Sequence, residues 1–119
     1  MPFDSTDYKP TTANPAVETL EAALAFLEEG PHRWCQKASA RDRDGISLRF
    51  GSRYLAYSAC STWAIRRCKP TYAAQFGALR ALRSVTGYEW VEDFNDAPDT
   101  TYEMVLDAFR RAIEIAKET

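Results

Sequence analysis

The 119-residue chain has few of the residues on which catalytic and metal-binding chemistry depends. It contains one histidine, three cysteines and five glycines, and none of its hydrophobic runs approaches the length of a membrane span. The odd number of cysteines argues against the disulfide framework of a small secreted domain. The N-terminus also lacks a basic segment followed by an apolar one. We therefore expect an intracellular protein with free, mostly buried thiols and no membrane contact.

Acidic residues are missing from the whole stretch between Gly45 and Tyr88, which carries seven cations. The rest of the chain holds all 17 acids and the other eight cations, so it sums to −9 although the net charge of the chain is −2. Acidic terminal helices could neutralise this basic middle within one fold, or the middle could offer a basic face to nucleic acid or to an acidic protein. A pI near 5.4 is far from that of a typical nucleic-acid-binding domain, which favours internal neutralisation.

Apolar residues recur at helical spacing in four segments of the chain. They predict helices near 15–29, 54–68, 71–86 and 101–117 in a single domain spanning 1–119, with an irregular N-terminal arm at 1–12. Asn14 and Pro15 suit an N-cap and a first helical position. Gly87 suits a left-handed C-terminal cap, and Thr100 with Glu103 fits a capping box before the last helix.

A short strand pattern separates the first two of these helices. Ile46, Leu48 and Phe50 alternate with polar residues, and Asp44-Gly45 is typical of a hairpin turn. The sequence therefore predicts a mainly α fold, a compact bundle of about four helices with a short β-hairpin between the first two.

Bulky and small apolar residues indicate how this bundle packs. We expect Trp34, Trp63 and Trp90 to supply much of the core. The inward face of the third helix should consist of Phe76, Leu79, Leu82 and Val85. Between the last two helices, Asn95, Asp96 and Pro98 are turn formers that should shape the chain through backbone bonds. Trp90 and Phe94 should pack against the core beside that turn.

Residue sets that could support chemistry are incomplete. His32 could form a nucleophilic pair with Cys35 or Cys60, but no third group is identifiable. His32, Cys35, Cys60 and Cys68 could bind zinc, although the spacing of Cys60 and Cys68 is unusual for such a site. The carboxylates that surround the expected turn are more typical of a solvated rim than of a cation site; they belong to Glu89, Glu92, Asp93, Asp96 and Asp99. We predict no catalytic residue, metal or cofactor, and a buried, unreactive Cys60.

Three pieces of the chain resemble a family of small bacterial, plasmid and phage proteins of unknown function. They are Trp34-Cys35-Gln36 with the turn from Asp42 to Gly45, Cys60 with Ala64, and Asn95-Asp96-Ala97-Pro98. The family has tryptophan where this chain has Phe94, and glycine where it has Trp63. The resemblance implies an accessory role in a mobile element and supplies no catalytic residues.

These observations lead to a protein that acts by binding another macromolecule. The first hypothesis is a phage or mobile-element accessory protein in the cytoplasm of a bacterial host, for instance an inhibitor of a host defence complex. A virion component and a nucleic-acid-binding module are the alternatives, with a small thiol enzyme or zinc protein after them. The residues expected to contact an acidic protein partner, with at most weak binding of nucleic acid, are Arg66, Arg67, Lys69, Arg80 and Arg83.

Overall fold

The computed structural model describes residues 14–49 and 56–118 and is mainly helical, as predicted. Its elements in chain order are α1 (Pro15–Leu27), the 3-10 helix η2 (Pro31–Arg33), β1 (Ala40–Arg41), β2 (Ser58–Ala59), α2 (Ser61–Arg66), α3 (Tyr72–Thr86), α4 (Val91–Asp96) and α5 (Tyr102–Lys117). A short helix, α4, was not predicted. No helix within the described ranges is both long and apolar enough to cross a membrane.

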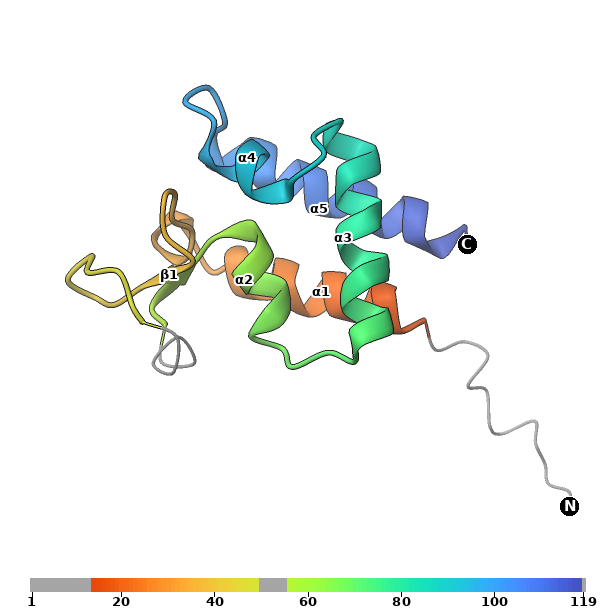
Figure 1. Cartoon of the computed structure of the whole chain (residues 1–119), viewed down its shortest axis with the longest axis horizontal. Helices are drawn as coiled ribbons and strands as arrows, with labels where there is room; N and C mark the ends of the chain where they lie inside the picture. Colours follow the sequence, from red (N-terminus) through yellow and green to blue (C-terminus); the bar gives the residue numbers. More distant parts are fainter. Residues whose placement is uncertain (1–13, 50–55, 119) are drawn as a thin grey trace, which may run out of the picture.

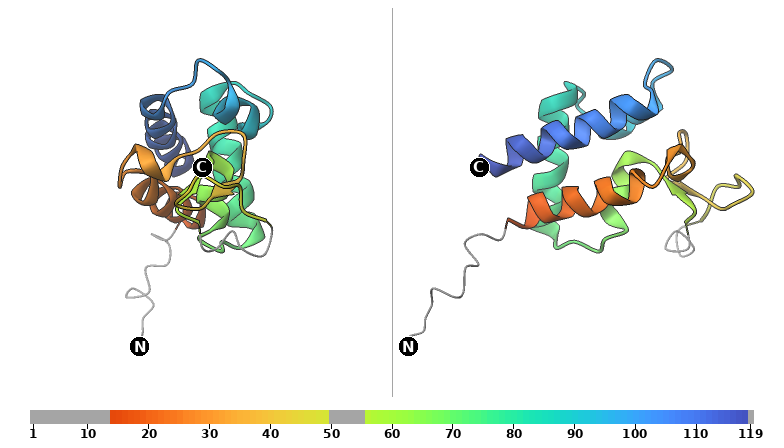
Figure 2. Two further views of the ribbon diagram at one scale, coloured as in Figure 1. Left: turned by 90° about the vertical axis from the view of Figure 1, so that its left-hand side faces the viewer. Right: turned by 180° about the vertical axis from the view of Figure 1, so that it is seen from behind.

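The three long helices pack against one another and enclose most of the core. The helices α1 and α5 run in opposite directions, and α3 crosses both (Figure 1; Figure 2). Leu20, Leu82, Val105 and Phe109 are almost completely buried between them. The apolar stripe predicted for α5 is confirmed, since each of its members is buried: Val105, Ala108, Phe109, Ala112, Ile113 and Ala116.

Side-chain caps fix where the long helices begin. Asn14 Oδ1 accepts a hydrogen bond from Val17 N at 3.2 Å, and Pro15 occupies the first helical position, as predicted. The capping box predicted from Thr100 and Glu103 does not form. The N-cap of α5 is Thr101, whose Oγ1 accepts from Met104 N at 3.2 Å, while the buried Thr100 Oγ1 donates to Phe94 O at 2.7 Å. Thr100 is therefore used to close the connection between α4 and α5.

The paired strands differ from the expected hairpin in their second member. Ala40 and Arg41 pair antiparallel with Ala59 and Ser58, so β1 pairs with β2 rather than with the segment from Ile46 onward. The predicted turn does form, with Gly45 at φ +82° and an isolated bridge between Arg41 and Ser47. Phe50, the end of the expected strand, lies outside the described residues.

The second predicted helix begins later than its apolar pattern suggested. Ser58 and Ala59 are extended because they pair with β1. Cys60 is the N-cap of α2, and its Sγ accepts a hydrogen bond from Trp63 N at 3.3 Å. Strand pairing thus overrides helical spacing over 56–60, and residues 54 and 55 lie outside the described ranges.

Two aromatic residues predicted to be buried are exposed. Phe76 is 48% exposed and Trp90 60% exposed, whereas alanines of α3 line its contact with the other helices. A methyl group added to Gly77 would lie 3.1 Å from the Ala16 side chain, so α1 and α3 approach too closely to accommodate a phenylalanine there. Phe94, by contrast, is buried as predicted.

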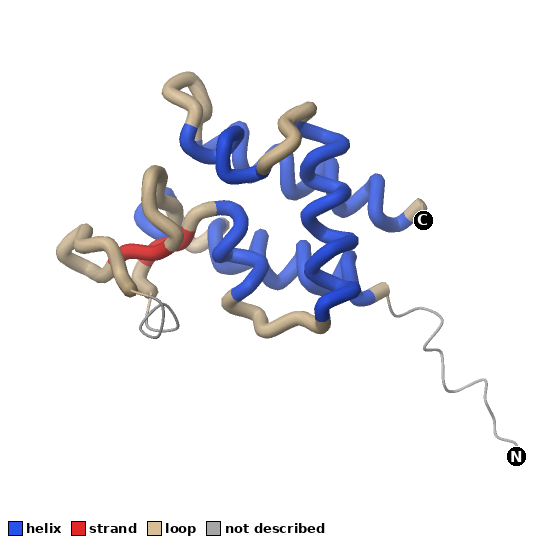
Figure 3. Tube along the Cα trace, in the orientation of Figure 1, coloured by secondary structure: helices blue, strands red, loops and turns tan. Residues whose placement is uncertain are grey.

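Loops gather at the end of the molecule where α1 finishes, while α5 ends at the opposite side (Figure 3). These loops, with η2, β1 and β2, lie next to α2 and α4 and form the surroundings of the candidate site.

Candidate functional site

The side chain of Asn95, on α4, joins three segments that are far apart in the sequence. It is completely buried, and its Oδ1 accepts from Trp34 Nε1 at 2.7 Å, from Ser61 N at 2.9 Å and from Ser61 Oγ at 2.6 Å. Its Nδ2 donates to Cys35 O at 3.0 Å. A buried amide needs such partners, because an unpaired polar group away from water is costly. We call these four residues the Asn95 cluster.

Hydrogen bonds beside the Asn95 cluster extend the same connection. Gln36 Nε2 donates to Asn95 O at 2.9 Å and to Ala97 O at 3.2 Å. Asp96 Oδ1 accepts from Lys37 N at 2.8 Å. Thus Asn95 and Asp96 do bond backbone amides, but the amides belong to distant segments, and both residues lie in a helix rather than in the predicted turn. The turn itself forms one step later, at Pro98 and Asp99.

A pocket of about 200 Å³ lies beside this cluster and is lined by Ala38, Ser39, Cys60, Glu92 and Asp96. Cys60 is buried as predicted, and its burial raises the pKa of the thiol to about 11. The thiol therefore stays protonated near neutral pH, whereas nucleophilic or metal-bound cysteine is a thiolate.

The residues considered for zinc or thiol chemistry are distributed over several elements. His32 is exposed and lies 5.3 Å from the Tyr57 ring, while Cys68 Sγ contacts Ala64 O at 3.5 Å. Burial also raises the pKa of Cys35 and Cys68. Over residues 14–49 and 56–118, no three histidine, cysteine or acidic side chains converge in an arrangement that could hold a metal ion.

The five predicted partner-binding cations are separated by the fold. Arg66 and Arg83 line a groove of about 90 Å³ between α2, α3 and α4, together with Glu89 and Glu92. The two acids match the charge of the two arginines in number.

The other three cations point elsewhere. Arg67 Cζ lies 3.9 Å from the centre of the Phe26 ring, on the side of α1. Arg80 Cζ lies 5.3 Å from the Phe76 ring, at the edge of a separate apolar groove between α3 and α5. Lys69 is exposed in the connection between α2 and α3. The set therefore forms no single basic face.

Exposed apolar side chains surround α4. Tyr88, Trp90 and Met104 are 40%, 60% and 44% exposed, and Trp90 borders the groove that holds Arg66 and Arg83. We call Tyr88, Trp90, Arg66 and Arg83 the α4 surface. Large aromatic and arginine side chains are the usual anchors of protein–protein contacts.

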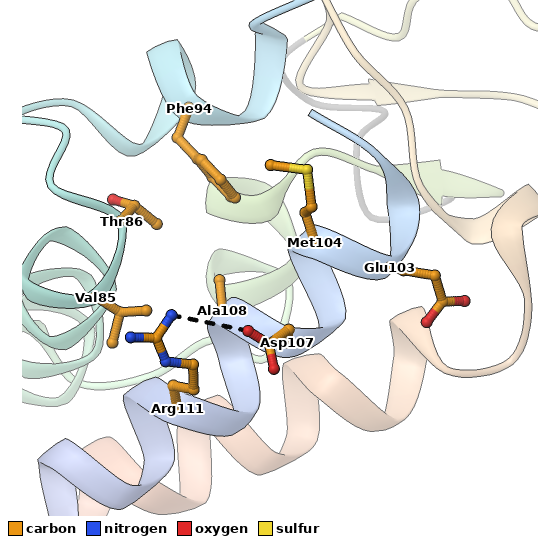
Figure 4. A pocket seen from close by; sticks show the side chains of 8 residues that line it. All are labelled: Val85, Thr86, Phe94, Glu103, Met104, Asp107, Ala108 and Arg111. Carbon is orange, nitrogen blue, oxygen red and sulfur yellow. Dashed lines mark ion pairs between the residues drawn. The ribbon is translucent and has the colours of Figure 1, made fainter. Parts of the chain in front are cut away.

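On the other side of α4 lies a pocket of about 470 Å³ at the junction of α3, α4 and α5 (Figure 4). Phe94 and Met104 face each other across it, and the ends of Val85 and Thr86 complete its apolar side. The Asp107–Arg111 ion pair, 3.8 Å long, borders the pocket. This pocket is large enough to hold an aliphatic side chain.

The sequence contains a signal for the exposure of Trp90 that its residue type alone conceals. Val91, Phe94 and Asn95 are spaced as one face of a helix, and all three are buried. Trp90 is the N-cap of that helix and lies off this face. Acidic neighbours at Glu89 and Glu92 also indicate a solvent-facing position.

The fold defines a small, mainly helical protein. A family model matches residues 11–115, and the chain belongs to that family, a family of unknown function (DUF6197). No curated protein and no solved structure matches the chain.

Proposed function

We propose that this protein is a phage or mobile-element accessory protein that binds another protein through the α4 surface, in the cytoplasm of the bacterial host. In its most concrete form it inhibits a host defence complex. The link to mobile elements comes from the motif resemblance, and the binding role comes from the composition of the α4 surface.

The observation that carries the proposal is the 60% exposure of Trp90 beside Arg66 and Arg83. Leaving an indole in water forfeits the free energy that burial would supply. Met104 and the buried Phe94 line a second pocket, on the other side of α4. A partner that covered Trp90 would bury an aromatic anchor between two arginines, a combination enriched among residues that dominate binding energy.

A photo-crosslinking experiment tests the proposal in the host bacterium. A photoreactive phenylalanine analogue replaces Trp90 in one variant and Tyr72 in a matched control. Tyr72 is 83% exposed and lies at the opposite end of α3. We expect a defined host protein to be crosslinked from position 90 and not from position 72. With that protein purified, Trp90→Ala should weaken binding by about 2 kcal/mol, or roughly 30-fold.

Three results would contradict the proposal. Adducts with nucleic acid would favour a nucleic-acid-binding module, and adducts with phage capsid or tail proteins would favour a virion component. Equal adducts from positions 90 and 72 would show that the α4 surface has no special role.

A further inference from the structure

A second surface, away from α4, consists of arginine and aromatic side chains that alternate in space. Arg43 and Arg33 lie 4.9 Å and 5.1 Å from the centre of the Tyr57 ring. Arg33 also lies 5.1 Å from the Phe26 ring, which Arg67 approaches to 3.9 Å. The order is therefore Arg43, Tyr57, Arg33, Phe26, Arg67, and we call these five residues the arginine–aromatic stack. They come from α1, η2, the end of α2 and two loops.

The middle arginine of the stack is already satisfied. Arg33 Nε donates to Glu29 Oε1 at 2.9 Å, and its NH1 donates to Tyr57 O at 2.9 Å. Its side chain is only 25% exposed. Arg33 thus holds the stack together and has little capacity for an external ligand.

The two end arginines are in a different situation. Arg43 is exposed and Arg67 is half-buried, and neither forms an ion pair within residues 14–49 or 56–118. An aromatic ring packs against each guanidinium, which lowers the entropy lost when its N–H groups bind a ligand. A guanidinium held in this way matches the two oxygens of a carboxylate or phosphate.

The neighbourhood of the stack decides between these two anions. Each ring is already approached by two arginines, and Phe26 is only 7% exposed, so the rings offer little free face for a nucleobase. Asp42 and Asp44 flank Arg43 in the same loop. These fixed negative charges repel a continuous polyanion more than they repel separate carboxylates.

We propose that the arginine–aromatic stack binds carboxylate side chains of an acidic protein segment, with Arg43 and Arg67 as the two anchoring forks. The inference rests on the proposed function, because it adds an electrostatic contact for the partner that the α4 surface engages. The charge-dependent contact would then involve Arg67, which lies against Phe26 of α1, rather than Arg66 and Arg83, which share their groove with two acids.

Fluorescence anisotropy with two labelled probes tests the stack in the full chain. The probes are a peptide whose four glutamates are separated by neutral residues and a single-stranded oligothymidylate of equal charge. The test variant is Arg43→Gln/Arg67→Gln. The control, Arg111→Gln/Lys117→Gln, removes the same charge from α5, where both cations already have acidic neighbours. We expect the test variant to bind the peptide about 10-fold more weakly and the control to change by less than about 2-fold.

A charge-preserving variant and a stability measurement separate binding from a purely structural role. Arg43→Lys/Arg67→Lys keeps both charges but loses the forks, so its affinity for the peptide should be intermediate. The inference is overturned if test and control lose affinity equally, or if oligothymidylate binds more tightly than the peptide. It is also overturned if the test variant lowers the melting temperature without changing peptide binding.

The two proposals fail in different ways. If position 90 crosslinks a host protein whose affinity is the same for the wild type and Arg43→Gln/Arg67→Gln, the stack inference is wrong and the proposed function stands. If no protein is crosslinked but peptide binding responds to the stack variants as expected, the proposed function is wrong instead.

Discussion

Two parts of this molecule are stabilised by different kinds of contact. The three-helix unit, α1, α3 and α5, buries aliphatic and alanine side chains with Phe109 at its centre. The motif unit, which comprises η2, β1, β2, α2 and α4, is joined through the Asn95 cluster, where one amide group connects Trp34, Ser61 and Cys35. The first unit is mostly apolar inside. The second shares the apolar core through Trp63, Ile65 and Phe94 and is in addition organised around a buried polar group.

This difference affects how each unit responds to change. Apolar burial is spread over many side chains, so cores often accept substitutions that conserve volume. A buried hydrogen-bond network depends on every member, because removing one leaves the others unpaired in a medium of low dielectric constant. We therefore expect the structure of the motif unit to depend on a few particular residues, and that of the three-helix unit to depend on the spacing of its apolar residues.

The largest expected effect is in the three-helix unit. Phe109→Ala removes a completely buried ring and should lower the free energy of unfolding by about 4 kcal/mol. Urea denaturation followed by circular dichroism measures the loss. Phe76→Ala is the control, since that ring is 48% exposed and should cost less than about 1 kcal/mol. Similar losses in the two variants would contradict the location of the core.

The next effect concerns the motif unit. Asn95→Ala leaves Trp34 Nε1, the amide and hydroxyl of Ser61 and the carbonyl of Cys35 without their partner. We expect a loss of about 3 kcal/mol. The thiols of Cys35 and Cys60 are buried in this unit, so their rate of labelling by a thiol reagent reports on its opening. In Asn95→Ala this rate should rise much more than the hydrogen-exchange rate of the slowest amides of α5.

A milder variant makes this test specific. Ser61→Ala removes one hydroxyl donor and retains the amide, so it should cost about 1 kcal/mol. If Asn95→Ala were no more harmful than Ser61→Ala, the cluster would not be the element that holds the motif unit together.

The two units also differ in how far the sequence predicts them. In α1 and α5 the apolar period, the Asn14 cap and the terminal glycine of α3 are local signals, and all are confirmed. Such signals act within a few residues, which is why they can be recognised in one sequence.

The motif unit was predicted less well because its contacts are not local. Asn95 was interpreted as a turn residue from its neighbours, whereas its role depends on Ser61 and Trp34, which lie 34 and 61 positions away. The start of α2 was predicted too early because strand pairing with β1 competes with helical spacing. The prediction that Trp90 packs against the core was wrong because residue type alone does not reveal which face of a six-residue helix is buried.

The pH dependence of stability offers a further test of the motif unit. Burial raises the pKa of the Cys60 thiol from its ordinary value near 9 to about 11. The folded state therefore retains a proton that the unfolded state releases between these values. The stabilisation is complete below about pH 9 and is lost as the pH rises through 9 toward 11, by about 3 kcal/mol in total.

Urea denaturation at pH values on both sides of this range measures the loss. Cys60→Ser is the matched control, because a hydroxyl can keep the cap of α2 but does not titrate there. The difference in unfolding free energy between wild type and control should shrink with rising pH. A constant difference would show that the thiol is not desolvated in the folded protein.

The smallest expected effect compares the two units through matched glycines. Gly45, in the turn before β2, and Gly87, at the end of α3, have φ values of +82° and +79°, and a methyl group added to either would contact nothing within 4 Å. An alanine at each position therefore suffers the same backbone strain and no clash. The free energy of unfolding should fall by about 1 kcal/mol, after allowance for the lower conformational entropy of the unfolded chain with alanine.

Gly87→Ala should lower the stability of the slowest-exchanging α5 amides by that amount. Gly45→Ala should instead accelerate labelling of Cys60 and leave those amides unchanged, because the motif unit opens separately. Asparagine at each position should recover part of the loss, since it tolerates a left-handed backbone better than alanine. If Gly45→Ala weakened the α5 amides as much as Gly87→Ala does, the two units would unfold as one, and their different contacts would have no separate thermodynamic consequence.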